Sequence, residues 1–465
     1  MNLDSNVYLK LDVDNLRLHL QPQYAFLCFD SKKLPKRGRL KQQAAIKLNK
    51  VAGEIIEKMY EPLSLSEIVN YFCRKYNDTE ENVFRNISIF FERLYNRYGI
   101  SVIECKNKYE IKNSCFTKTG SWDYLVPFGL VLELTYRCNY QCKHCYNNSS
   151  IYMLSEMKTD VILSILEEAY KLGIREIELT GGEPTVYSNI EEFLKKLFTY
   201  NFELIGLLTN GSNLSEEICQ LLYYNRERVV VQIDLHGSSP EYVRWFTGNE
   251  KAYYSAIDSI KKLSDLGIVV RVVCNVTSLN VEQMADVAEI AYKLGATAVA
   301  FGPIAPIGRA KSNNDLIISL DDKAFAMFEK NIENLIEKYG KNFISVIEEE
   351  IMSDSINCGV GRSGITLSPN LDVKICQMSD MSIGNLKFSG NSLKNFLQTY
   401  SMYFEIISQI PAPNKRICKE CENLWFCNNC LVRGLMKAYG EGEDKCVWRK
   451  EFLKNSFLLE IFQKK

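Results

Sequence analysis

The sequence predicts an α/β protein whose centre is an open, TIM-like partial (β/α)6 barrel, preceded by a winged-helix-like α+β domain and followed by a loop-rich domain. Three observations support this fold class. Strand-like and helix-like runs alternate six times between residues 131 and 305, short strands and three helices precede them, and cysteines crowd the C-terminal part. Such alternation is typical of a parallel sheet covered by helices. We therefore expect domains at 1–110, 125–330 and 345–465.

Composition and charge exclude several classes of function. A protein of 465 residues with ordinary composition has material for about three globular domains. The formal net charge of -1 removes the main electrostatic argument for nucleic acid or anionic lipid as a partner, and the basic run at 32–39 is expected to be a solvated loop. The sequence shows neither a secretory signal nor an apolar stretch near the roughly 18 residues that span a bilayer, so we expect a cytoplasmic protein without membrane contact.

The N-terminal domain is predicted from alternating runs followed by three helical stretches. Ser64-Leu-Ser-Glu67 is a capping box that opens the second helix. Strands are expected at 7–11, 16–20 and 25–29, the other two helices at 49–59 and 80–95, and Gly99 is expected to end the module. This is a winged-helix arrangement, which commonly binds DNA. The third helix carries more acids than bases over 80–95, so attraction to phosphate is expected to be poor.

The barrel is predicted from six strand-like runs with helices between them. They lie at 131–135, 176–180, 204–209, 229–235, 269–277 and 298–304. Six units are too few for the usual eight-stranded closed barrel but suit an open one, and chemistry is expected at the C-terminal ends of the strands. Beyond residue 345 the alternation stops, and short loops separate dense cysteines in a segment that needs metal to hold it together.

The protein has sixteen cysteines, which cannot be a disulfide framework in a protein expected to be cytoplasmic. Cytosolic reductants keep thiols reduced, so metal or cluster ligation is the leading explanation. Six cysteines stand singly among apolar or mixed residues and are expected to pack as small hydrophobes: Cys28, Cys73, Cys105, Cys115, Cys219 and Cys274. The other ten form two groups, 138–145 and 358–446.

The first group is Cys138-Asn-Tyr-Gln-Cys142-Lys-His-Cys145, directly after the first barrel strand. Three thiolates suit an iron-sulfur cube and leave one iron open for a further ligand, whereas closed clusters and structural zinc sites normally have four ligands. A zinc knuckle completed by His144 is the alternative. At the end of the second strand stands Gly181-Gly182-Glu183, where paired glycines permit close approach of a ligand and a carboxylate accepts hydrogen bonds from an ammonium group.

This CxxxCxxC spacing, together with the Gly-Gly-Glu segment, resembles the radical S-adenosylmethionine (SAM) superfamily. The resemblance implies that Cys138, Cys142 and Cys145 hold a [4Fe-4S] cluster and that Gly181 to Glu183 receive the methionine amino group of SAM. It further implies that reductive cleavage of SAM yields a 5'-deoxyadenosyl radical, which removes a hydrogen atom from the substrate. The protein then has to position the target C–H bond and exclude water.

Further contacts to SAM follow from the same resemblance. They fall on Tyr146 beside the last cysteine and on the polar strand tips Asn210 and Asp234, which are placed to meet ribose or carboxylate. Asp234 stands where relatives often carry Ser. Arg271 and Arg309 are expected to pair with the cofactor carboxylate, because Arg grips carboxylates with two hydrogen bonds, or else to form structural ion pairs.

The second group contains seven cysteines and two CxxC pairs, which favours a zinc ribbon as one interpretation. Only five residues separate Cys421 from Cys427, however, against roughly 15 to 20 in four-cysteine zinc modules. The group resembles the SPASM domain of radical SAM peptide maturases, which implies two auxiliary iron-sulfur clusters. By that resemblance the distal cluster is held by Cys418, Cys421, Cys427 and Cys446, and the inner one by Cys358, Cys376 and Cys430 without an obvious fourth ligand.

Two departures from the SPASM pattern are visible. Leu371 stands where the pattern has Gly, and the spacing from Cys427 to Cys430 is one residue shorter than usual, as in sactipeptide synthases. The N-terminal module resembles the PqqD-like domain that recognises leader peptides, in which an extended peptide adds a strand to a sheet edge. The order of the three parts resembles sactipeptide synthases over nearly the whole sequence.

The resemblance implies a radical SAM maturase that joins a Cys sulfur to the α carbon of an acceptor residue in a ribosomally made peptide. The implied mechanism binds the substrate thiolate to the inner cluster, which takes the surplus electron. The implied partners are a Cys-containing precursor peptide with a leader and a flavodoxin- or ferredoxin-type electron donor. Thioethers to β or γ carbons, carbon-carbon crosslinks and related oxidations stay open, as do an iron-sulfur DNA-binding sensor and a maturase of the sulfatase-activating kind.

Overall fold

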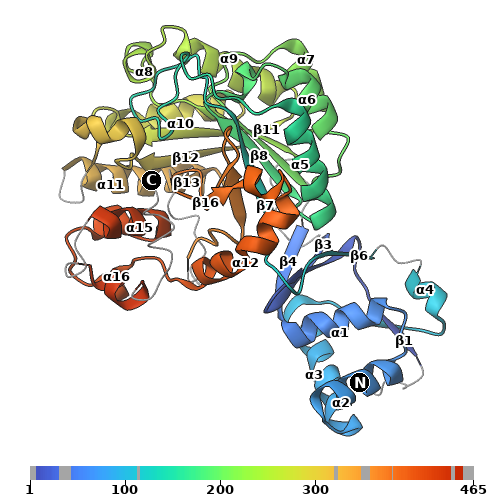
Figure 1. Ribbon diagram of the computed structural model, residues 1–465. Helices are drawn as coiled ribbons and strands as arrows, with labels where there is room; N and C mark the ends of the chain where they lie inside the picture. Colours follow the sequence, from blue (N-terminus) through green and yellow to red (C-terminus); the bar gives the residue numbers. More distant parts are fainter. Residues whose placement is uncertain are drawn as a thin grey trace. The chain divides into compact units, whose positions relative to one another are not determined.

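The computed structural model describes residues 7–30, 43–112, 116–318, 323–346, 357–379, 381–440 and 446–453. The protein divides near residue 126 into two compact units, which are described one by one (Figure 1). The basic run at 32–39 and Cys115 lie outside the described residues. Within the described residues, no helix is long and apolar enough to cross a membrane.

The N-terminal unit contains two antiparallel strands, a four-stranded sheet and four helices. The pair is β1 (Tyr8–Leu11) with β5 (Val102–Cys105), and the sheet has the order β4-β3-β2-β6. The sheet strands are β2 (Leu16–Gln21), β3 (Tyr24–Asp30), β4 (Gln43–Asn49) and β6 (Phe116–Gly120), with only β2 and β6 parallel among their pairings. The helices are α1 (Lys50–Tyr60), α2 (Leu65–Tyr76), α3 (Glu80–Tyr98) and α4 (Lys108–Lys112).

The three predicted strands and three predicted helices of this unit are all present. The capping box forms as expected, because the Glu67 carboxylate accepts a hydrogen bond from the Ser64 backbone N–H at 2.7 Å and the Ser64 hydroxyl accepts one from the Glu67 N–H at 3.3 Å. Gly99 ends α3 with a φ of 70°, which glycine adopts without strain. The unit does not end there, since β5, α4 and β6 follow. Leu18, Leu27, Ile56 and Phe91 are among its fully buried core residues.

The second unit is built on a ten-stranded sheet with the order β13-β12-β11-β10-β9-β8-β7-β14-β15-β16. The first eight strands of that order are parallel to their neighbours. The six predicted barrel strands correspond to β7 (Gly129–Thr135), β8 (Glu176–Gly181), β9 (Leu204–Thr209), β10 (Val229–Asp234), β11 (Val269–Val276) and β12 (Ala298–Pro303). The α/β fold with a large parallel sheet and a separate N-terminal domain is therefore confirmed.

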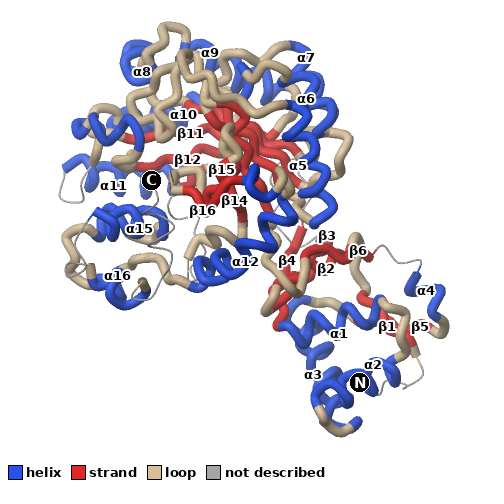
Figure 2. The backbone as a smooth tube through the Cα atoms, viewed as in Figure 1, coloured by secondary structure: helices blue, strands red, loops and turns tan. Residues whose placement is uncertain are grey.

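Helices cover the outer side of this sheet (Figure 2). They are α5 (Thr159–Leu172), α6 (Ile190–Leu197), α7 (Glu216–Tyr224), α8 (Pro240–Thr247), α9 (Ala252–Asp265), α10 (Met284–Lys293) and α11 (Lys323–Tyr339). Helices α5 and α6 carry buried apolar residues at helical spacing. Ile162 and Leu166 are examples from α5, and Phe193 is one from α6.

The segment after residue 345 joins the barrel sheet, which the sequence did not lead us to expect. Strand β13 (Ile344–Val346) extends one edge, and β14 (Gly364–Leu367), β15 (Asp372–Lys374) and β16 (Ser382–Asn385) extend the other. These strands have three or four residues, too few to show an alternating pattern. Helices α12 (Leu393–Gln409), α13 (Lys415–Cys418), α14 (Leu424–Cys427), α15 (Leu431–Gly440) and α16 (Val447–Phe452) follow.

A buried ion pair ties this extension to the barrel. The Lys374 ammonium on β15 lies 2.7 Å and 2.8 Å from the two carboxylate oxygens of Glu133 on β7, and the side chains are 5% and 0% exposed. Glu133 also accepts hydrogen bonds from Tyr136 and Asn147 in the loop that follows β7. A charge buried this deeply is tolerated only when it is paired and hydrogen-bonded, so Glu133 depends on Lys374 as its counter-charge.

We expect Lys374→Ala to lower the free energy of unfolding by about 3–5 kcal/mol, because it leaves Glu133 buried without a counter-charge. The measurement is a urea titration followed by far-ultraviolet circular dichroism. The matched control is Lys171→Ala, which removes an exposed ion pair to Glu167 on helix α5 and should leave stability within error. Equal effects of the two substitutions would contradict the role given to Lys374.

Candidate functional site

A cavity of about 400 Å³ opens at the C-terminal ends of the parallel strands, the edge at which α/β barrels carry their chemistry. Its wall is formed by strand ends β8 to β12, by the loop after β7 and by the C-terminal segment. The predicted site residues that line it are Cys138, Cys142, Cys145, Tyr146, Gly181, Gly182, Glu183, Asn210, Asp234 and Cys430. The predictions for these residues thus converge on one cavity.

The loop that carries the three cysteines is held by its backbone. The guanidinium of Arg309 donates to the carbonyls of Cys142 at 2.5 Å and Ser149 at 2.7 Å, and the Arg309 N–H donates to the Cys145 carbonyl at 2.9 Å. Gly308 has a φ of 55°, and a Cβ there would lie 2.4 Å from the carbonyl oxygens of Cys145 and Tyr146. Arg309 therefore positions the loop and lies outside the cavity lining. The sequence led us to expect that its guanidinium would pair with the cofactor carboxylate or form a structural ion pair, whereas it bonds backbone carbonyls.

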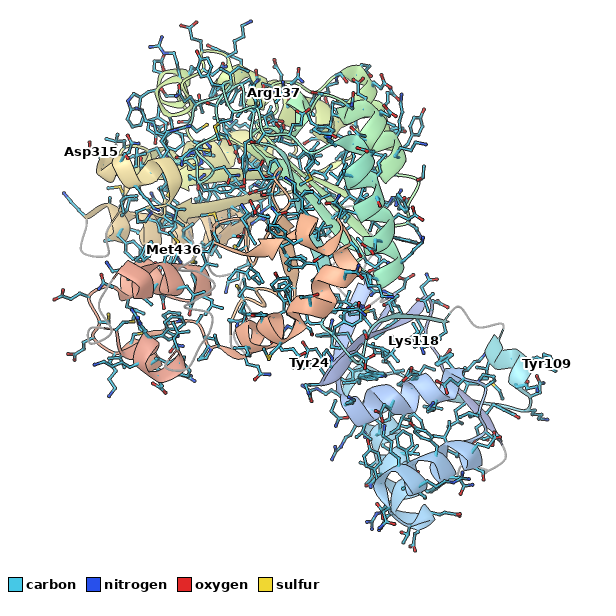
Figure 3. All side chains as sticks on the ribbon, viewed as in Figure 1. Tyr24, Tyr109, Lys118, Arg137, Asp315 and Met436 are labelled. Carbon is cyan, nitrogen blue, oxygen red and sulfur yellow. The ribbon has the colours of Figure 1, made fainter. Side chains whose placement is uncertain are left out.

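The other side of the loop is fastened to the barrel by Arg137, which Figure 3 labels. Its guanidinium pairs with Glu156 at 3.0 Å and donates to the Val186 carbonyl at 2.8 Å. The sulfur of Cys138 accepts the Tyr140 N–H at 3.4 Å, and that of Cys145 accepts the Ser149 N–H at 3.3 Å. N–H groups aimed at sulfur favour its thiolate form.

His144, the fourth ligand of the alternative zinc knuckle, also lines this cavity. Its ring stacks on Phe246 with centroids 4.8 Å apart, and its Nε2 lies 3.0 Å from the Asn275 amide. Its Nδ1 is buried without a hydrogen-bond partner among the described residues. The zinc knuckle therefore stays open on geometry, and the metal content separates it from an iron-sulfur cube.

Burial makes two of the three thiols hold their protons more tightly than usual. Burial raises the pKa of the Cys138 thiol to about 12 and that of Cys142 well above its usual range. Binding to a metal displaces such protons, so the site takes up its ligand with proton release. Three convergent thiols beside an open cavity fit a cube with one vacant iron.

The Gly-Gly-Glu segment lies against the cysteine loop. A Cβ on Gly182 would stand 2.3 Å from the carbonyl oxygen of Arg137, and Gly181 has a φ of 125°. Close packing lets the N–H groups of Gly182 and Glu183 donate to the carbonyls of Thr135 at 2.7 Å and Arg137 at 3.0 Å. Both glycines are therefore required where the second strand meets the loop.

Glu183 is fully buried and works as a hub between strand ends. Its carboxylate accepts four hydrogen bonds, from the Thr185 N–H and hydroxyl, the Thr209 hydroxyl and the Asn210 N–H, at 2.6 to 3.0 Å. Three of these bonds reach Oε1 and one reaches Oε2, so Oε2 keeps room for a further donor. Burial raises the pKa of Glu183 despite these bonds. Asn210 in turn bonds Asn139 of the cysteine loop at 2.9 Å.

Comparison with known proteins decides the family. The Radical SAM superfamily model matches residues 132–294, from within β7 to just past α10. The barrel over these residues thus matches the radical SAM superfamily. It is 26% identical to the antilisterial bacteriocin subtilosin biosynthesis protein AlbA of Bacillus subtilis over 94% of this chain and 95% of that relative. It is also 26% identical to the sporulation killing factor maturation protein SkfB of the same species, over 58% of this chain and 64% of that one.

Solved structures show the same fold. The crystal structure of Streptococcus suis SuiB matches with a TM-score of 0.61 and 14% identity, covering 91% of this chain and 96% of that one. These relationships confirm the predicted kinship with radical SAM peptide maturases. The protein is thus a radical SAM enzyme, with SAM and a [4Fe-4S] cluster as its cofactors. The cavity fits both, because three thiols, the glycine pair and polar strand tips share one wall.

The remaining predicted contacts to SAM differ in placement. Asp234 lines the cavity, and burial followed by the charge of Glu183 raises the pKa of its carboxyl to about 7. Arg271 lies outside the cavity lining and stands near Glu178, whose carboxyl it influences electrostatically. Burial raises the pKa of Glu178 to about 7, against the opposing effect of Arg271. Arg271 therefore influences a carboxyl inside the barrel, away from the SAM cavity where the sequence led us to expect it.

The C-terminal cysteines fall into the two sets named from sequence. Cys418, Cys421, Cys427 and Cys446 line one small cavity of about 20 Å³. Cys358, Cys376 and Cys430 lie close enough to influence one another electrostatically. Burial and then the charge of Cys430 raise the pKa of the Cys376 thiol to about 12, and the charge of Cys430 also acts to raise the pKa of Cys358. Cys430 also lines the SAM cavity.

Sequence reasoning missed three residues at this site. Gln377 and Arg433 line the cavity, and Arg137 anchors the loop. Gln377 directly follows a predicted cluster ligand, Cys376, and Arg137 directly precedes another, Cys138. Adjacency to a ligand was the signal available for both. Arg433 lies in the first turn of helix α15, three residues after Cys430, which directly precedes the helix. This spacing places the two residues on the same side of the helix start.

We expect Cys142→Ala to remove about four iron atoms per protein molecule, because one thiolate fewer leaves the loop unable to hold its cube. Inductively coupled plasma mass spectrometry of anaerobically isolated protein measures this. The control Cys219→Ala changes a cysteine buried in helix α7 and should keep the full iron content. Unchanged iron in Cys142→Ala, or zinc in its place in the unaltered protein, would contradict the site.

We expect Glu178→Gln to stabilise the protein at alkaline pH. A carboxyl whose folded pKa of about 7 exceeds its usual 4.5 binds more protons when folded, so its burial lowers stability as pH rises from 4.5 through 7. The gain on substitution should reach at most about 3 kcal/mol at pH 8 and disappear near pH 4. Urea titrations at both pH values measure the difference, and a gain independent of pH would contradict this assignment.

Proposed function

We propose that this enzyme is a peptide maturase that joins a Cys sulfur of a ribosomally made peptide to the α carbon of an acceptor residue. One observation carries the proposal. Cys430, from the set expected to hold the inner auxiliary cluster, lines the same cavity as the three cysteines of the radical SAM loop. A sulfur bound at the inner set and a C–H bond facing SAM would therefore meet in one space.

When bound, the loop cluster and SAM supply a 5'-deoxyadenosyl radical able to take a hydrogen atom from a C–H bond. The protein's own residues do the rest. Gly181 and Gly182 let the backbone approach the methionine amino group, Asp234 accepts hydrogen bonds from the ribose, and Tyr146 closes the wall toward the C-terminal segment. Arg309 keeps the loop in place through its backbone carbonyls, and Glu183 joins the strand ends while also lining the cavity.

The inner set has three cysteines and so offers an open position to a substrate thiolate, for which iron has high affinity. Bond formation takes one hydrogen from sulfur and one from carbon. The carbon's hydrogen atom passes to the 5'-deoxyadenosyl group, the thiol proton goes to solvent, and one electron is left over. The adjacent auxiliary cluster is the acceptor that we assign to this electron, and a flavodoxin- or ferredoxin-type protein is its partner for electron exchange.

The division into three domains is part of the proposal. Residues 1–110 serve as a PqqD-like leader-recognition domain, 125–330 as the radical SAM barrel and 345–465 as a SPASM domain with two auxiliary clusters. The two cysteine sets described above support the SPASM assignment. SuiB, whose fold this protein shares, has been solved bound to S-adenosylmethionine and bound to its precursor peptide SuiA, which supports a peptide as the substrate class.

A groove of about 540 Å³ in the N-terminal unit suits the leader. It lies between β4, an edge strand of the described sheet, and helix α3. An extended peptide can pair with the free edge of β4 while apolar residues such as Ile46, Leu48 and Phe90 take its side chains. Lys47, Arg93 and Arg97 add positive charge, so the leader we propose is acidic as well as apolar.

The balanced charge of helix α3 as a whole weighs against the DNA-binding sensor. Helix α3 runs to Tyr98 and thereby carries three acids and three arginines, which leaves it without net attraction for phosphate. A maturase of the sulfatase-activating kind would have no use for a leader groove. Attack on β or γ carbons, or carbon-carbon bond formation, uses the same cavity and is separated from the proposed reaction only by the product.

The decisive test of the proposed reaction is mass spectrometry of the Cys-containing peptide encoded beside this protein's gene, after anaerobic reaction with the reconstituted enzyme and SAM. Each thioether should remove the mass of two hydrogen atoms. An acceptor residue labelled with deuterium at the α carbon should lose that deuterium to 5'-deoxyadenosine. Retention of the α deuterium in a crosslinked product would place the bond elsewhere, and loss of the crosslink should follow from replacing the substrate Cys.

We expect the double substitution Arg93→Glu and Arg97→Glu to raise the dissociation constant of the precursor peptide by about tenfold or more, since two attractive charges become repulsive. Fluorescence anisotropy of the labelled peptide with full-length enzyme measures this, and the effect should shrink with salt. Arg85→Glu, on the same helix but outside the groove lining, is the control and should bind normally. Equal losses in both variants would contradict this site for the leader.

A further inference from the structure

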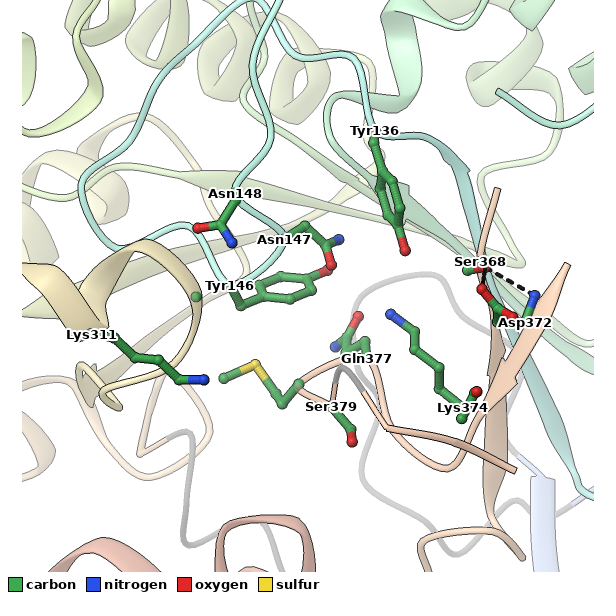
Figure 4. Close-up of a pocket in the computed structure, with 13 residues that line it drawn as sticks. Tyr136, Tyr146, Asn147, Asn148, Lys311, Ser368, Asp372, Lys374, Gln377 and Ser379 are labelled. Carbon is green, nitrogen blue, oxygen red and sulfur yellow. Dashed lines mark hydrogen bonds between the residues drawn. The ribbon is translucent and has the colours of Figure 1, made fainter. Parts of the chain in front are cut away.

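A second cavity of about 230 Å³ adjoins the SAM cavity, and Figure 4 shows the residues around it. Tyr146, Gln377 and Met378 line both cavities, so these three side chains form a shared wall. The rest of the second cavity comes from the loop after Cys145, from the turn at Gly308 and from strands β15 and β16 with their connections. It thus lies where the barrel meets the C-terminal segment.

The lining of this cavity is polar, and its charges balance. Lys374 is paired with Glu133, and the remaining charged side chains, Lys311 and Asp372, have opposite signs. Asn147 donates to Glu133 and to the Gly181 carbonyl. The cavity consequently suits an uncharged polar ligand better than an anion, and a peptide backbone, with its alternating donors and acceptors, has that character.

Gln377 stands out at the shared wall. Its Oε1 is buried and has no hydrogen-bond partner among the described residues. Buried amide groups are almost always hydrogen-bonded, which indicates that this one is completed by a ligand. Figure 4 shows the amide pointing into the space between Tyr146 and Lys374.

The position of Gln377 in the sequence adds a second constraint. It directly follows Cys376 of the inner set, while its side chain borders the SAM cavity. A group placed there lies between the site that would bind the substrate sulfur and the site that would receive the hydrogen atom. A primary amide can accept one hydrogen bond and donate another at the same time, which matches the N–H and C=O of a single peptide residue.

We propose that Gln377 is a substrate-binding residue whose amide pairs with the backbone N–H and C=O of the acceptor residue, while the second cavity takes the neighbouring residues of the peptide. The assignment rests on the proposed function. Pairing of this kind fixes rotation about the acceptor's backbone, so that its α C–H bond faces the SAM cavity and the C–H bonds further out along the acceptor do not. Gln377 thereby selects the carbon that reacts.

The test compares Gln377→Ala with the unaltered enzyme and with Gln220→Ala, the same change at an exposed position on helix α7. The substrate is the precursor peptide encoded beside the gene, deuterated at the α carbon of the acceptor. Three quantities are measured: crosslinks formed, 5'-deoxyadenosine formed, and the fraction of 5'-deoxyadenosine that carries deuterium. Gln377→Ala should still cleave SAM but form about tenfold more 5'-deoxyadenosine per crosslink, with a lower deuterated fraction.

A second variant separates binding from folding. Gln377→Asn keeps the amide but shortens its reach, and should produce crosslinks at other carbons, detected by fragmentation of the product. Iron content equal to the unaltered enzyme shows that Cys376 still binds its cluster. Unchanged coupling and an unchanged crosslink position in both variants would overturn the proposal. Absence of any α-carbon thioether with the unaltered enzyme would instead overturn the proposed function.

Discussion

The structure depends on one constraint, which is that a loop must turn three sulfurs toward a single cavity while its own backbone polar groups are satisfied elsewhere. Short-range turns cannot meet that demand alone. Arg309 reaches from the far end of the parallel sheet to the carbonyls of Cys142 and Ser149, and Arg137 fastens the opposite side of the loop. With the carbonyls bonded outward, the N–H groups near Cys138 and Cys145 remain free to face sulfur.

The same constraint explains why the C-terminal segment continues the barrel sheet. Strand β14 pairs with β7 in parallel, and Lys374 on β15 neutralises Glu133 on β7. This pairing places Cys376 and Gln377 near the cysteine loop, so the proposed sulfur-binding set and the SAM cavity are brought together by backbone pairing more than by loops alone. Precise placement of this kind is what a reaction between a held thiolate and a short-lived radical requires.

Sequence patterns predicted the long elements and the cysteine sets, because apolar periodicity and ligand spacing are local properties. They missed β13 to β16, which are too short to show a period, and they assigned Arg309 to the cofactor because nothing local reveals a bond to the carbonyl of Cys142. Leu371 illustrates the reverse case. It departs from the glycine of the SPASM pattern, yet it adopts a φ of 70° in the turn between β14 and β15, so the backbone still has the conformation that favours glycine.

The central claim is that Cys138, Cys142 and Cys145 hold an iron cube with one iron open to SAM. Low-temperature electron paramagnetic resonance of the reduced protein, recorded before and after addition of SAM, tests it most directly. The account predicts a [4Fe-4S]+ signal whose g values shift when SAM binds the open iron, and no such shift in a variant with Cys142 replaced by Ala. A spectrum that SAM leaves unchanged in the unaltered protein would contradict it.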